Sequence, residues 1–473
     1  MKNIIIAGAG HGGLVAAKLL AEAGFTVTVF EKQAEDALGY DQYDSVHLDG
    51  FELSGVPVPE EYRVKRTGLA FILPGSDLPA LKQGVKDETY NVEIDRKALY
   101  RWLIAPAKAA GVTFKFGVTV KEPIILGSRV AGLRTSEGDV YADLVIDAAG
   151  IYSPVRMNLP ETFSITRDVR KYDLLHPYRA FFRRELSAGE PENPYTVSLL
   201  PTPFCGVMWA IMKETEVDVL IASTEDVTDD AMTERLEELK AITPQIGDFL
   251  RGGRLPDIPI RQPLSLLVAD GYAAVGDAAF MTVPVKGSGV GHAMRAGKIL
   301  AEVVIADEAG FYSRETLWPY QVKFFEEIGF GSALMACIKD ELPTISDENL
   351  DYVFRSNLIS SDLLEKFGSE AGMLGLLSSI KPGEIRETVK KIAGHQDLRR
   401  LILRAGSNLG RCKLLERNLK DKYEPKAVKK WVAAYDGFFS GVLDVAAAEA
   451  EKIKNPPAKE ETPPDAEEQN AQE

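Results

Sequence analysis

The chain opens with the stretch Ile4-Ile5-Ile6-Ala7-Gly8-Ala9-Gly10-His11-Gly12-Gly13, in which a short apolar run leads directly into closely spaced glycines. This order predicts a buried strand, a tight turn and the start of a helix. A second predicted strand, residues 26–30, ends in Glu31, which stands 18 residues after Gly13. The arrangement is typical of the first βαβ unit of a dinucleotide-binding fold.

Each part of this unit has a physical reason. Gly8 allows the sharp turn, Gly10 lets the backbone approach a pyrophosphate, and Gly13 lets the helix pack close to the strand. A phosphate would bind at the helix N-terminus, where amides are free and the helix dipole favours negative charge. The carboxylate of Glu31 can accept both hydroxyls of an adenosine ribose. The remaining candidate cofactor-binding residues of this unit are His11, Gly12 and Lys32.

The composition excludes several classes of protein. A net charge of −15 and a pI near 5.1 argue against a nucleic-acid-binding surface. The three cysteines lie far apart and show no metal-ligand spacing, so we expect no metal site and a reduced, cytoplasmic setting. The first apolar run is too short for a signal peptide, and no run is long enough to span a bilayer. Contact with a membrane surface remains open.

The pattern of the chain predicts an α/β protein with a Rossmann-type dinucleotide-binding domain, an inserted mixed β-sheet substrate domain and a C-terminal helical region. The alternating short apolar runs in the middle of the chain favour the inserted sheet. Beyond residue 310, helical periodicity continues to about residue 454, and the end of the chain is acidic and almost free of apolar residues. The expected boundaries are 1–160 and 262–310 for the two parts of the cofactor domain, 161–261 for the substrate domain, 311–454 for the helical region and 455–473 for a tail without a fold.

Several local elements can also be predicted. We expect a helix that follows Asp95 as its N-cap, a hairpin at Glu137-Gly138, and helices over 229–241 and 290–306. Residues 39–47 and 55–59, which are polar, aromatic or rich in proline and glycine, are predicted to form loops. The buried strand 142–147 ends in Ala148-Ala149-Gly150, where small residues would let a flat cofactor lie close above the sheet.

Three separated segments resemble one family. Gly8 to Glu31, Asp95-Arg96-Lys97-Ala98-Leu99, and Gly276-Asp277-Ala278 with Pro284 and Gly287-Ser288-Gly289 are together similar to flavoproteins of the para-hydroxybenzoate hydroxylase superfamily. Within that superfamily the chain looks most like the geranylgeranyl reductase branch. The resemblance covers about residues 1–306 and says little about the C-terminal helices.

The resemblance implies that the cofactor is FAD and assigns roles to residues of this chain. Arg96 would lie along the phosphates or the ribityl chain, and the backbone of Val118 or Val120 would meet the adenine. Asp277 would accept a hydrogen bond from a ribityl hydroxyl, and Pro284 would lie at the flavin face. The amides of Gly287, Ser288, Gly289 and Val290 would point at the flavin N1 and O2 side, where a reduced flavin carries negative charge. NAD(P)H, if it is the electron donor, would visit without a domain of its own.

The chain also departs from its superfamily. Phe280 stands where many aromatic hydroxylases carry a histidine after the Gly-Asp-Ala segment. Prenyl reductases place a cysteine in the loop after the second strand, and residues 39–55 contain none. The tryptophan halogenases carry a WxWxIP element, of which only Trp209 is present here.

No catalytic residue stands out. The weak candidates are Tyr43, Asp44 and His47, on a segment expected to face the flavin, and Lys286, beside the expected flavin edge. The leading hypothesis is an FAD-dependent oxidoreductase that reduces C=C bonds of a small, apolar, prenyl-like substrate. The alternatives are a flavin monooxygenase acting on a small or aromatic substrate, and a flavin-binding protein that transfers electrons. The C-terminal helices would then serve as a lid, as a homodimer surface or as a docking surface for a redox partner.

Overall fold

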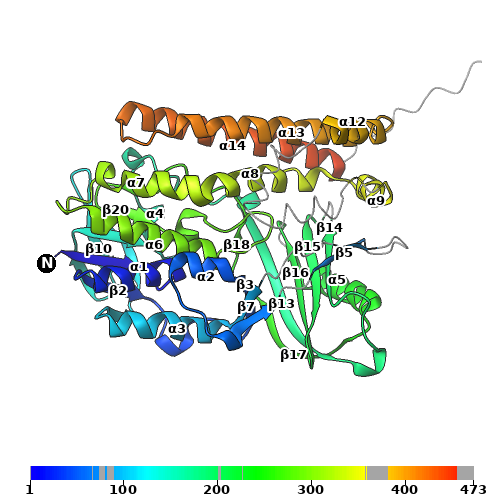
Figure 1. The fold of residues 1–473 in the computed structure, drawn as a ribbon, viewed down its shortest axis with the longest axis horizontal. Helices are drawn as coiled ribbons and strands as arrows, with labels where there is room; N and C mark the ends of the chain where they lie inside the picture. Colours follow the sequence, from blue (N-terminus) through cyan, green and yellow to red (C-terminus); the bar gives the residue numbers. More distant parts are fainter. Residues whose placement is uncertain are drawn as a thin grey trace, which may run out of the picture.

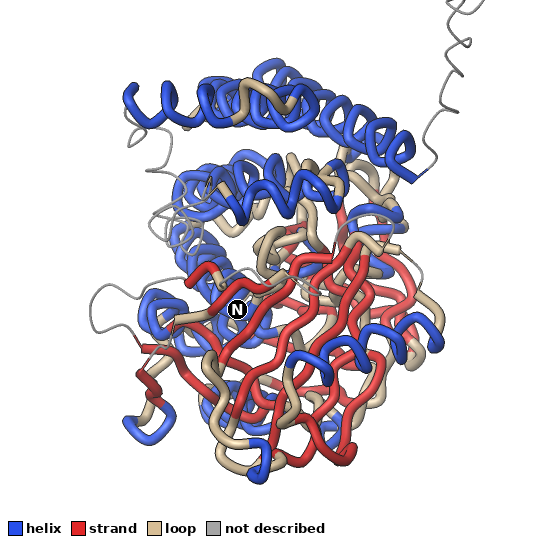
Figure 2. The backbone as a smooth tube through the Cα atoms, turned by 90° about the vertical axis from the view of Figure 1, so that its right-hand side faces the viewer, coloured by secondary structure: helices blue, strands red, loops and turns tan. Residues whose placement is uncertain are grey.

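The computed structural model describes residues 2–65, 68–73, 80–82, 90–200, 204–225, 227–356, 358 and 382–454. Two sheet-based bodies lie side by side, and helices from the second half of the chain cover them in two layers (Figures 1 and 2). The tail 455–473, predicted to lack a fold, lies outside the described residues.

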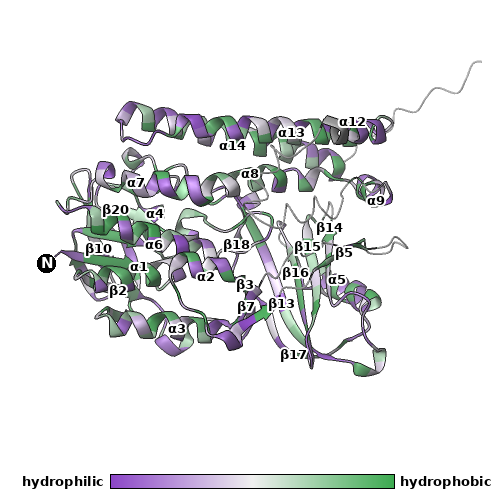
Figure 3. Ribbon diagram, viewed as in Figure 1, coloured by the Kyte–Doolittle hydropathy of each residue, from purple (hydrophilic) through white to green (hydrophobic). Residues whose placement is uncertain are grey.

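The first body is built on a six-stranded sheet in the order β19-β20-β12-β1-β2-β8. Its neighbouring strands run parallel except for the edge pair β19 and β20. The inner strands β1, β12 and β20 are apolar apart from one residue each in β1 and β12, because helices cover both faces of such a sheet. Around the N-terminus the strands are coloured hydrophobic in Figure 3. The bounds are β1 Asn3–Ala7, β2 Thr26–Glu31, β8 Thr113–Phe116, β12 Leu144–Asp147, β19 Val268–Ala269 and β20 Tyr272–Ala274.

Three helices pack on this sheet and start at its carboxyl edge or beside it. They are α1 His11–Glu22, α3 Arg96–Ala109 and α6 Val290–Ala306. Helix α3 begins where the sequence predicted, because the Asp95 side chain accepts a hydrogen bond of 2.8 Å from the amide of Ala98. A three-stranded sheet beside the six-stranded sheet contains the predicted hairpin. Its strands are β9 Val120–Leu126, β10 Arg129–Thr135 and β11 Gly138–Tyr141.

The second body is a large, mostly antiparallel sheet in the order β17-β13-β16-β15-β14-β5-β6, with β18 paired to β13. Helix α5, Asp229–Ile242, covers one face through an apolar cluster that includes Phe182, Met208 and Val219. Strands β5 and β6 come from the first 160 residues, so the chain enters this sheet before the segment predicted to form it. The bounds are β5 Ala70–Ile72, β6 Leu81–Lys82, β13 Leu174–Arg184, β14 Tyr195–Leu200, β15 Gly206–Met212, β16 Glu216–Ser223, β17 Ile246–Arg254 and β18 Ile258–Pro259.

A small sheet lies between the two bodies, in the order β3-β7-β4. The prediction of a loop over residues 39–47 was wrong for its second half, because β3 covers Tyr43–His47 and pairs antiparallel with β7. Local polarity concealed this strand; pairing to a distant partner stabilises it. Helix α2, Leu48–Ser54, follows directly, and the other strands are β4 Arg63–Lys65 and β7 Tyr90–Asp95.

Apart from the short α4, Pro154–Met157, near the end of β12, the remaining described helices belong to the C-terminal region. Helices α7 Arg314–Phe324 and α8 Phe330–Lys339 form the inner layer over the sheets, and α13 Gln396–Leu415 and α14 Pro425–Lys454 form the outer one (Figure 1). A π-helical turn, Phe325–Gly329, joins α7 to α8, and the aromatic ring of Phe325 packs against Trp431 and Tyr435 of α14. Short helices of this region are α9 Asp347–Arg355 and α12 Pro382–Lys391. No helix of the described residues is long and apolar enough to cross a membrane.

Candidate functional site

The glycine turn between β1 and α1 is built by close contact with the end of β12. Gly8 has a positive φ of 84°, and a Cβ placed there would lie 2.6 Å from the carbonyl oxygen of Ala148. A Cβ on Gly13 would lie 2.6 Å from the Cβ of Ala148. Both positions therefore need glycine for the turn and for the approach of helix to strand.

Gly12 has a different role from that of its neighbours in the turn. A Cβ on Gly12 would collide with the carbonyl oxygen of Ala293 in α6, and a Cβ on Gly297 would collide with the carbonyl oxygen of Gly12. Helices α1 and α6 thus touch backbone to backbone. This contact directly joins the glycine turn, which the sequence analysis assigned to the pyrophosphate, to the helix after the loop that it assigned to the flavin ring.

Glu31 ends β2 and is largely buried. Its Oε2 accepts a hydrogen bond of 2.8 Å from the amide of Ala9, and its Oε1 accepts one of 2.9 Å from the amide of Gln33. Each carboxylate oxygen has a second acceptor position, so the group can still accept ribose hydroxyls beside the glycine turn. Lys32 is exposed.

Arg96, the first residue of α3, lies against the glycine turn. One of its Nη atoms is 3.4 Å from Nε2 of His11, and the ring of His11 packs on Tyr100 with a centroid distance of 4.7 Å. Burial, and then the Arg96 charge, hold the pKa of His11 well below 6.5. The imidazole at the phosphate turn is therefore neutral at neutral pH.

The charges of Arg96, Glu31 and Asp277, which the sequence analysis assigned to one cofactor, all act on the phenol of Tyr100. Burial raises the pKa of this phenol to about 12; the charge of Arg96 opposes the rise, and those of Glu31 and Asp277 add to it. Asp277 itself accepts a hydrogen bond of 2.8 Å from the hydroxyl of Thr282. Desolvation raises the pKa of Asp277, while that hydrogen bond and the charge of Arg96 act against the rise.

The loop before α6 forms a tight turn. The amide of Gly287 donates to the carbonyl of Val283 at 2.9 Å, so it is not free to point at a ligand as the sequence predicted. Ser288 forms an antiparallel bridge with Val283, so its amide faces the carbonyl of Val283. Within the described part of the chain, the amides of Gly289 and Val290 have no hydrogen-bond partner. These two amides can serve a negatively charged group at the N-terminus of α6.

The other predicted residues take various positions. Pro284 is buried beside this loop, and Lys286 is exposed. Gly150 follows β12 with a positive φ of 82°. Val118 donates its amide to the carbonyl of Glu31 at 2.9 Å, which leaves only its carbonyl for an adenine, and the buried Val120 begins β9. The Nδ1–H of His292 donates to the carbonyl oxygen of Met281 at 2.9 Å, which is a structural contact.

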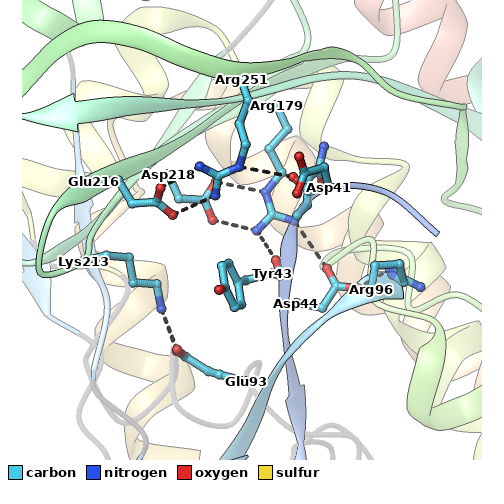
Figure 4. A network of polar contacts seen from close by, with 11 residues as sticks. Asp41, Tyr43, Asp44, Glu93, Arg96, Arg179, Lys213, Glu216, Asp218 and Arg251 are labelled. Carbon is cyan, nitrogen blue, oxygen red and sulfur yellow. Dashed lines mark hydrogen bonds and ion pairs between the residues drawn. The ribbon is translucent and has the colours of Figure 1, made fainter. Parts of the chain in front are cut away.

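The catalytic candidates on β3 prove to be held in an ion network (Figure 4). Asp44 forms ion pairs with Arg96 and, at 3.3 Å, with Arg179 of β13. Arg179 also donates to the carboxylate of Asp218, at 2.6 Å and 2.9 Å, and to the carbonyl oxygen of Tyr43 at 2.8 Å. Asp44 is therefore a link between the two bodies and a poor candidate for a proton donor. His47 is partly buried at the start of α2, and the Tyr43 side chain is half exposed.

Phe280 has a structural role. Its fully buried ring lies between two guanidinium groups, those of Arg156 and Arg261, each 4.7 Å from the ring centroid. Arg261 is paired with Asp173 at 2.9 Å, and Arg156 donates to the carbonyl of Arg167 at 2.7 Å. A residue enclosed in this way cannot reach a substrate.

Sequence reasoning missed Tyr100 and Arg179. Tyr100 could have been found, because it stands four residues after Arg96 on a predicted helix and so lies on the same face. Arg179 carried no local signal; only the pairing of β13 with β16 brings it to Asp218 and Asp44.

The residues fit a dinucleotide. The glycine turn has a neutral imidazole and helix amides, Arg96 supplies a cation, and Glu31 supplies a buried acceptor. With the two amides at the start of α6, these groups supply the donors and acceptors that a pyrophosphate, a ribose and an anionic ring edge require. Among the described residues, no group of three or more histidine, cysteine, aspartate or glutamate side chains could hold a metal ion. The assignment of individual residues to FAD stays a prediction.

Comparisons with known proteins agree with this geometry. Residues 46–303 match the family model described as FAD dependent oxidoreductase, and residues 6–65 match an NAD(P)-binding Rossmann-like domain. The chain is 26% identical to the digeranylgeranylglycerophospholipid reductase of Methanothrix thermoacetophila over 402 residues, covering 80% of this chain and 96% of that one. It is 25% identical to the enzyme of the same name from Sulfolobus acidocaldarius, covering 79% and 84%.

Solved structures share the fold. A geranylgeranyl bacteriochlorophyll reductase-like protein from Thermoplasma acidophilum superimposes with a TM-score of 0.67 at 19% identity, covering 83% of this chain and 98% of that one. The flavin-dependent brominase Bmp2 gives a TM-score of 0.57 at 17% identity, covering 83% and 94%. The same architecture therefore occurs in proteins whose names denote different reactions.

Proposed function

The chain belongs to the family of FAD dependent oxidoreductases, and from this premise we propose that it reduces C=C bonds in the prenyl chain of a lipid. FAD supplies the hydride chemistry when it is bound. The protein then has to bind the flavin, orient the substrate over it and exclude water.

The observation that carries the proposal is the face of the large sheet opposite α5. Trp209 and Leu220 are partners in register, and Arg179 lies opposite Leu220 on the next strand, so the three side chains share this face. Phe181, on the same face of β13, is 1% exposed. The contacts from Arg179 to Tyr43 and Asp44 turn this face toward the small sheet and, through Arg96, toward the glycine turn.

The charges on this face are all compensated. Arg251 is paired with Glu216 at 2.7 Å, and Lys213 is paired with Glu93 at 2.7 Å (Figure 4). Arg179 is paired with the carboxylates of Asp44 and Asp218, as described above. Since each of these cations already has its counter-ion, the face favours an apolar chain over an anionic head group.

The cofactor-binding residues complete the proposal. Glu31 would accept the ribose hydroxyls, Arg96 would contact the phosphates, and the amides of Gly289 and Val290 would stabilise negative charge on the flavin ring. The relatives named digeranylgeranylglycerophospholipid reductase support a diprenyl lipid as the substrate. NAD(P)H acts as a transient donor, and the protein meets its lipid at a membrane surface.

Anaerobic stopped-flow spectroscopy tests the reaction. Reduced holoenzyme mixed with an unsaturated prenyl lipid should reoxidise its flavin, whereas the fully saturated lipid of the same length should leave it reduced. Reoxidation only by dioxygen, with oxygenation of an added aromatic compound, would replace the reductase with a monooxygenase. Reoxidation only by a redox protein would indicate electron transfer.

A further inference from the structure

The charge of this protein is unevenly distributed along the chain. Residues 396–430, which comprise α13, the following link and the first turns of α14, contain eleven lysine and arginine residues and four aspartate and glutamate residues. Their net charge of +7 stands in a chain whose total is −15. We call the exposed part of this segment the basic surface. It lies in the outermost helical layer, above α7 and α8 (Figure 1).

The basic surface also exposes large apolar side chains. Leu403 and Leu414 of α13 are 62% and 52% exposed. They alternate along one face of α13 with the exposed cations Arg400 and Arg411, at spacings of three, eight and three residues. The exposed Arg417 follows in the short 3₁₀ turn after the helix. Figure 3 shows this mixture of hydrophilic and hydrophobic residues along the two outer helices. Exposed leucines flanked by long cations are typical of helices that lie in a lipid interface.

A hollow opens on the same face, between α13 and α14. Its volume is about 350 Å³, and its lining is Arg411, Leu414, Leu415, Ala434, Gly437 and Phe438. The guanidinium of Arg411 lies over the ring of Phe438, 5.1 Å from its centroid. The exposed leucine and the cation of α13 therefore face the same opening as the small residues of α14, and the two helices present a single surface. In the first turns of α14, Lys426, Lys429 and Lys430 are exposed as well.

We propose that the basic surface docks on a bilayer that contains anionic lipids. The arginines and lysines contact the lipid phosphates, and Leu403 and Leu414 enter the boundary between head groups and chains. Charge complementarity selects this partner, because an otherwise acidic protein would be repelled by such a bilayer everywhere else. The inference rests on the proposed function in one respect: a lipid substrate has to be collected from a membrane.

Vesicle flotation of the FAD-loaded, full-length protein tests the proposal without any turnover. Vesicles of phosphatidylcholine with about one-third phosphatidylglycerol should carry the protein, vesicles of phosphatidylcholine alone should not, and about 0.5 M salt should release it. The triple variant Arg411→Gln, Arg417→Gln, Lys429→Gln should lower the vesicle partition coefficient at least tenfold. The double variant Leu403→Ser, Leu414→Ser should lower it as well while keeping the salt dependence.

A matched control removes three exposed cations elsewhere, with Lys115→Gln, Lys121→Gln and Arg183→Gln. It should float like the wild type. Equal flotation of the wild type and the first triple variant would overturn the proposal, as would equal binding to neutral and anionic vesicles. A wild-type dimer that the same triple substitution dissociates, with no vesicle binding, would make the basic surface an interface between two copies. Vesicle binding by an enzyme that reduces no prenyl lipid would leave the proposal intact and remove the proposed function.

Discussion

Arg96 at the start of α3 forms an ion pair with Asp44 on β3, and the same guanidinium approaches His11 in the glycine turn. One cation thus joins the cofactor side of the molecule to the ion network that reaches the large sheet (Figure 4). Its removal should affect flavin binding more than folding, because Asp44 keeps Arg179 as a partner.

Arg96→Ala should therefore weaken FAD binding about tenfold to hundredfold, the range expected when a charged hydrogen-bond donor to a phosphate is lost. Arg101→Ala, an exposed arginine on the same helix, is the matched control and should leave the Kd unchanged. Fluorescence titration of the apoprotein with FAD measures both. Equal Kd values for the two variants would remove Arg96 from the site.

Asp44→Asn should have the opposite effect on the flavin. The substitution removes a negative charge beside the expected pyrophosphate and frees Arg96, so FAD should bind at least as tightly as in the wild type. Thermal unfolding should occur at a lower temperature, because Arg96 and Arg179 both lose a counter-ion. A weaker FAD complex would show that Asp44 is needed to hold Arg96 in place.

Gly8→Ala should abolish measurable FAD binding, since the added Cβ combines a positive φ with a contact of 2.6 Å to the Ala148 carbonyl. Gly24→Ala is the control for backbone strain alone: its φ is 90°, yet no atom lies within 4 Å of the added Cβ. It should cost about 1 kcal/mol of stability and retain FAD. Loss of FAD in both variants would mean that strain, and not the close approach to β12, is decisive.

The stability of the apoprotein should fall in mild acid because of His11. Its folded-state pKa lies well below the 6.5 of the unfolded chain, so the unfolded state takes up the proton first as the pH falls. The free energy of unfolding should decline below pH 6.5 by at most about 1.4 kcal/mol per pH unit from this residue. Urea denaturation at several pH values should show this slope in the wild type and a smaller one in His11→Gln. Identical slopes would contradict a neutral, buried His11.

Asp277 should contribute in the opposite direction. Its pKa is raised in the folded state, so its ionisation destabilises the apoprotein as the pH rises above the unfolded value of 3.8. Asp277→Asn should therefore stabilise the apoprotein at neutral pH, with a gain that vanishes below about pH 4, and should weaken FAD binding if the carboxylate accepts a ribityl hydroxyl. A variant less stable than the wild type at pH 7 would show that the Thr282 hydrogen bond outweighs the desolvation.

The sequence predicted the cofactor domain well because its signals are local. The glycine turn, the Asp95 cap and the Gly-Asp-Ala segment are each set by neighbouring residues, and helix α6 begins and ends where its periodicity indicated. The strand β3 was missed because its alternation is weak and its partner, β7, lies more than forty residues later. Asp44 was weighed as a catalytic group for the same reason: its two arginine partners come from α3 and β13 and leave no pattern in the sequence around it.

The backbone contact between Gly12 and Gly297 fixes the distance between the N-termini of α1 and α6. Helix α1 starts at the turn expected to take the pyrophosphate, and helix α6 starts at the loop expected to take the isoalloxazine, so their crossing fixes how far apart these two anion-binding ends stand. A ligand has to match that span to satisfy both ends at once. FMN carries the same ribityl phosphate and would satisfy both ends, but it lacks the adenosine ribose that Glu31 is expected to bind, so Glu31, and not the helix crossing, distinguishes FAD from FMN.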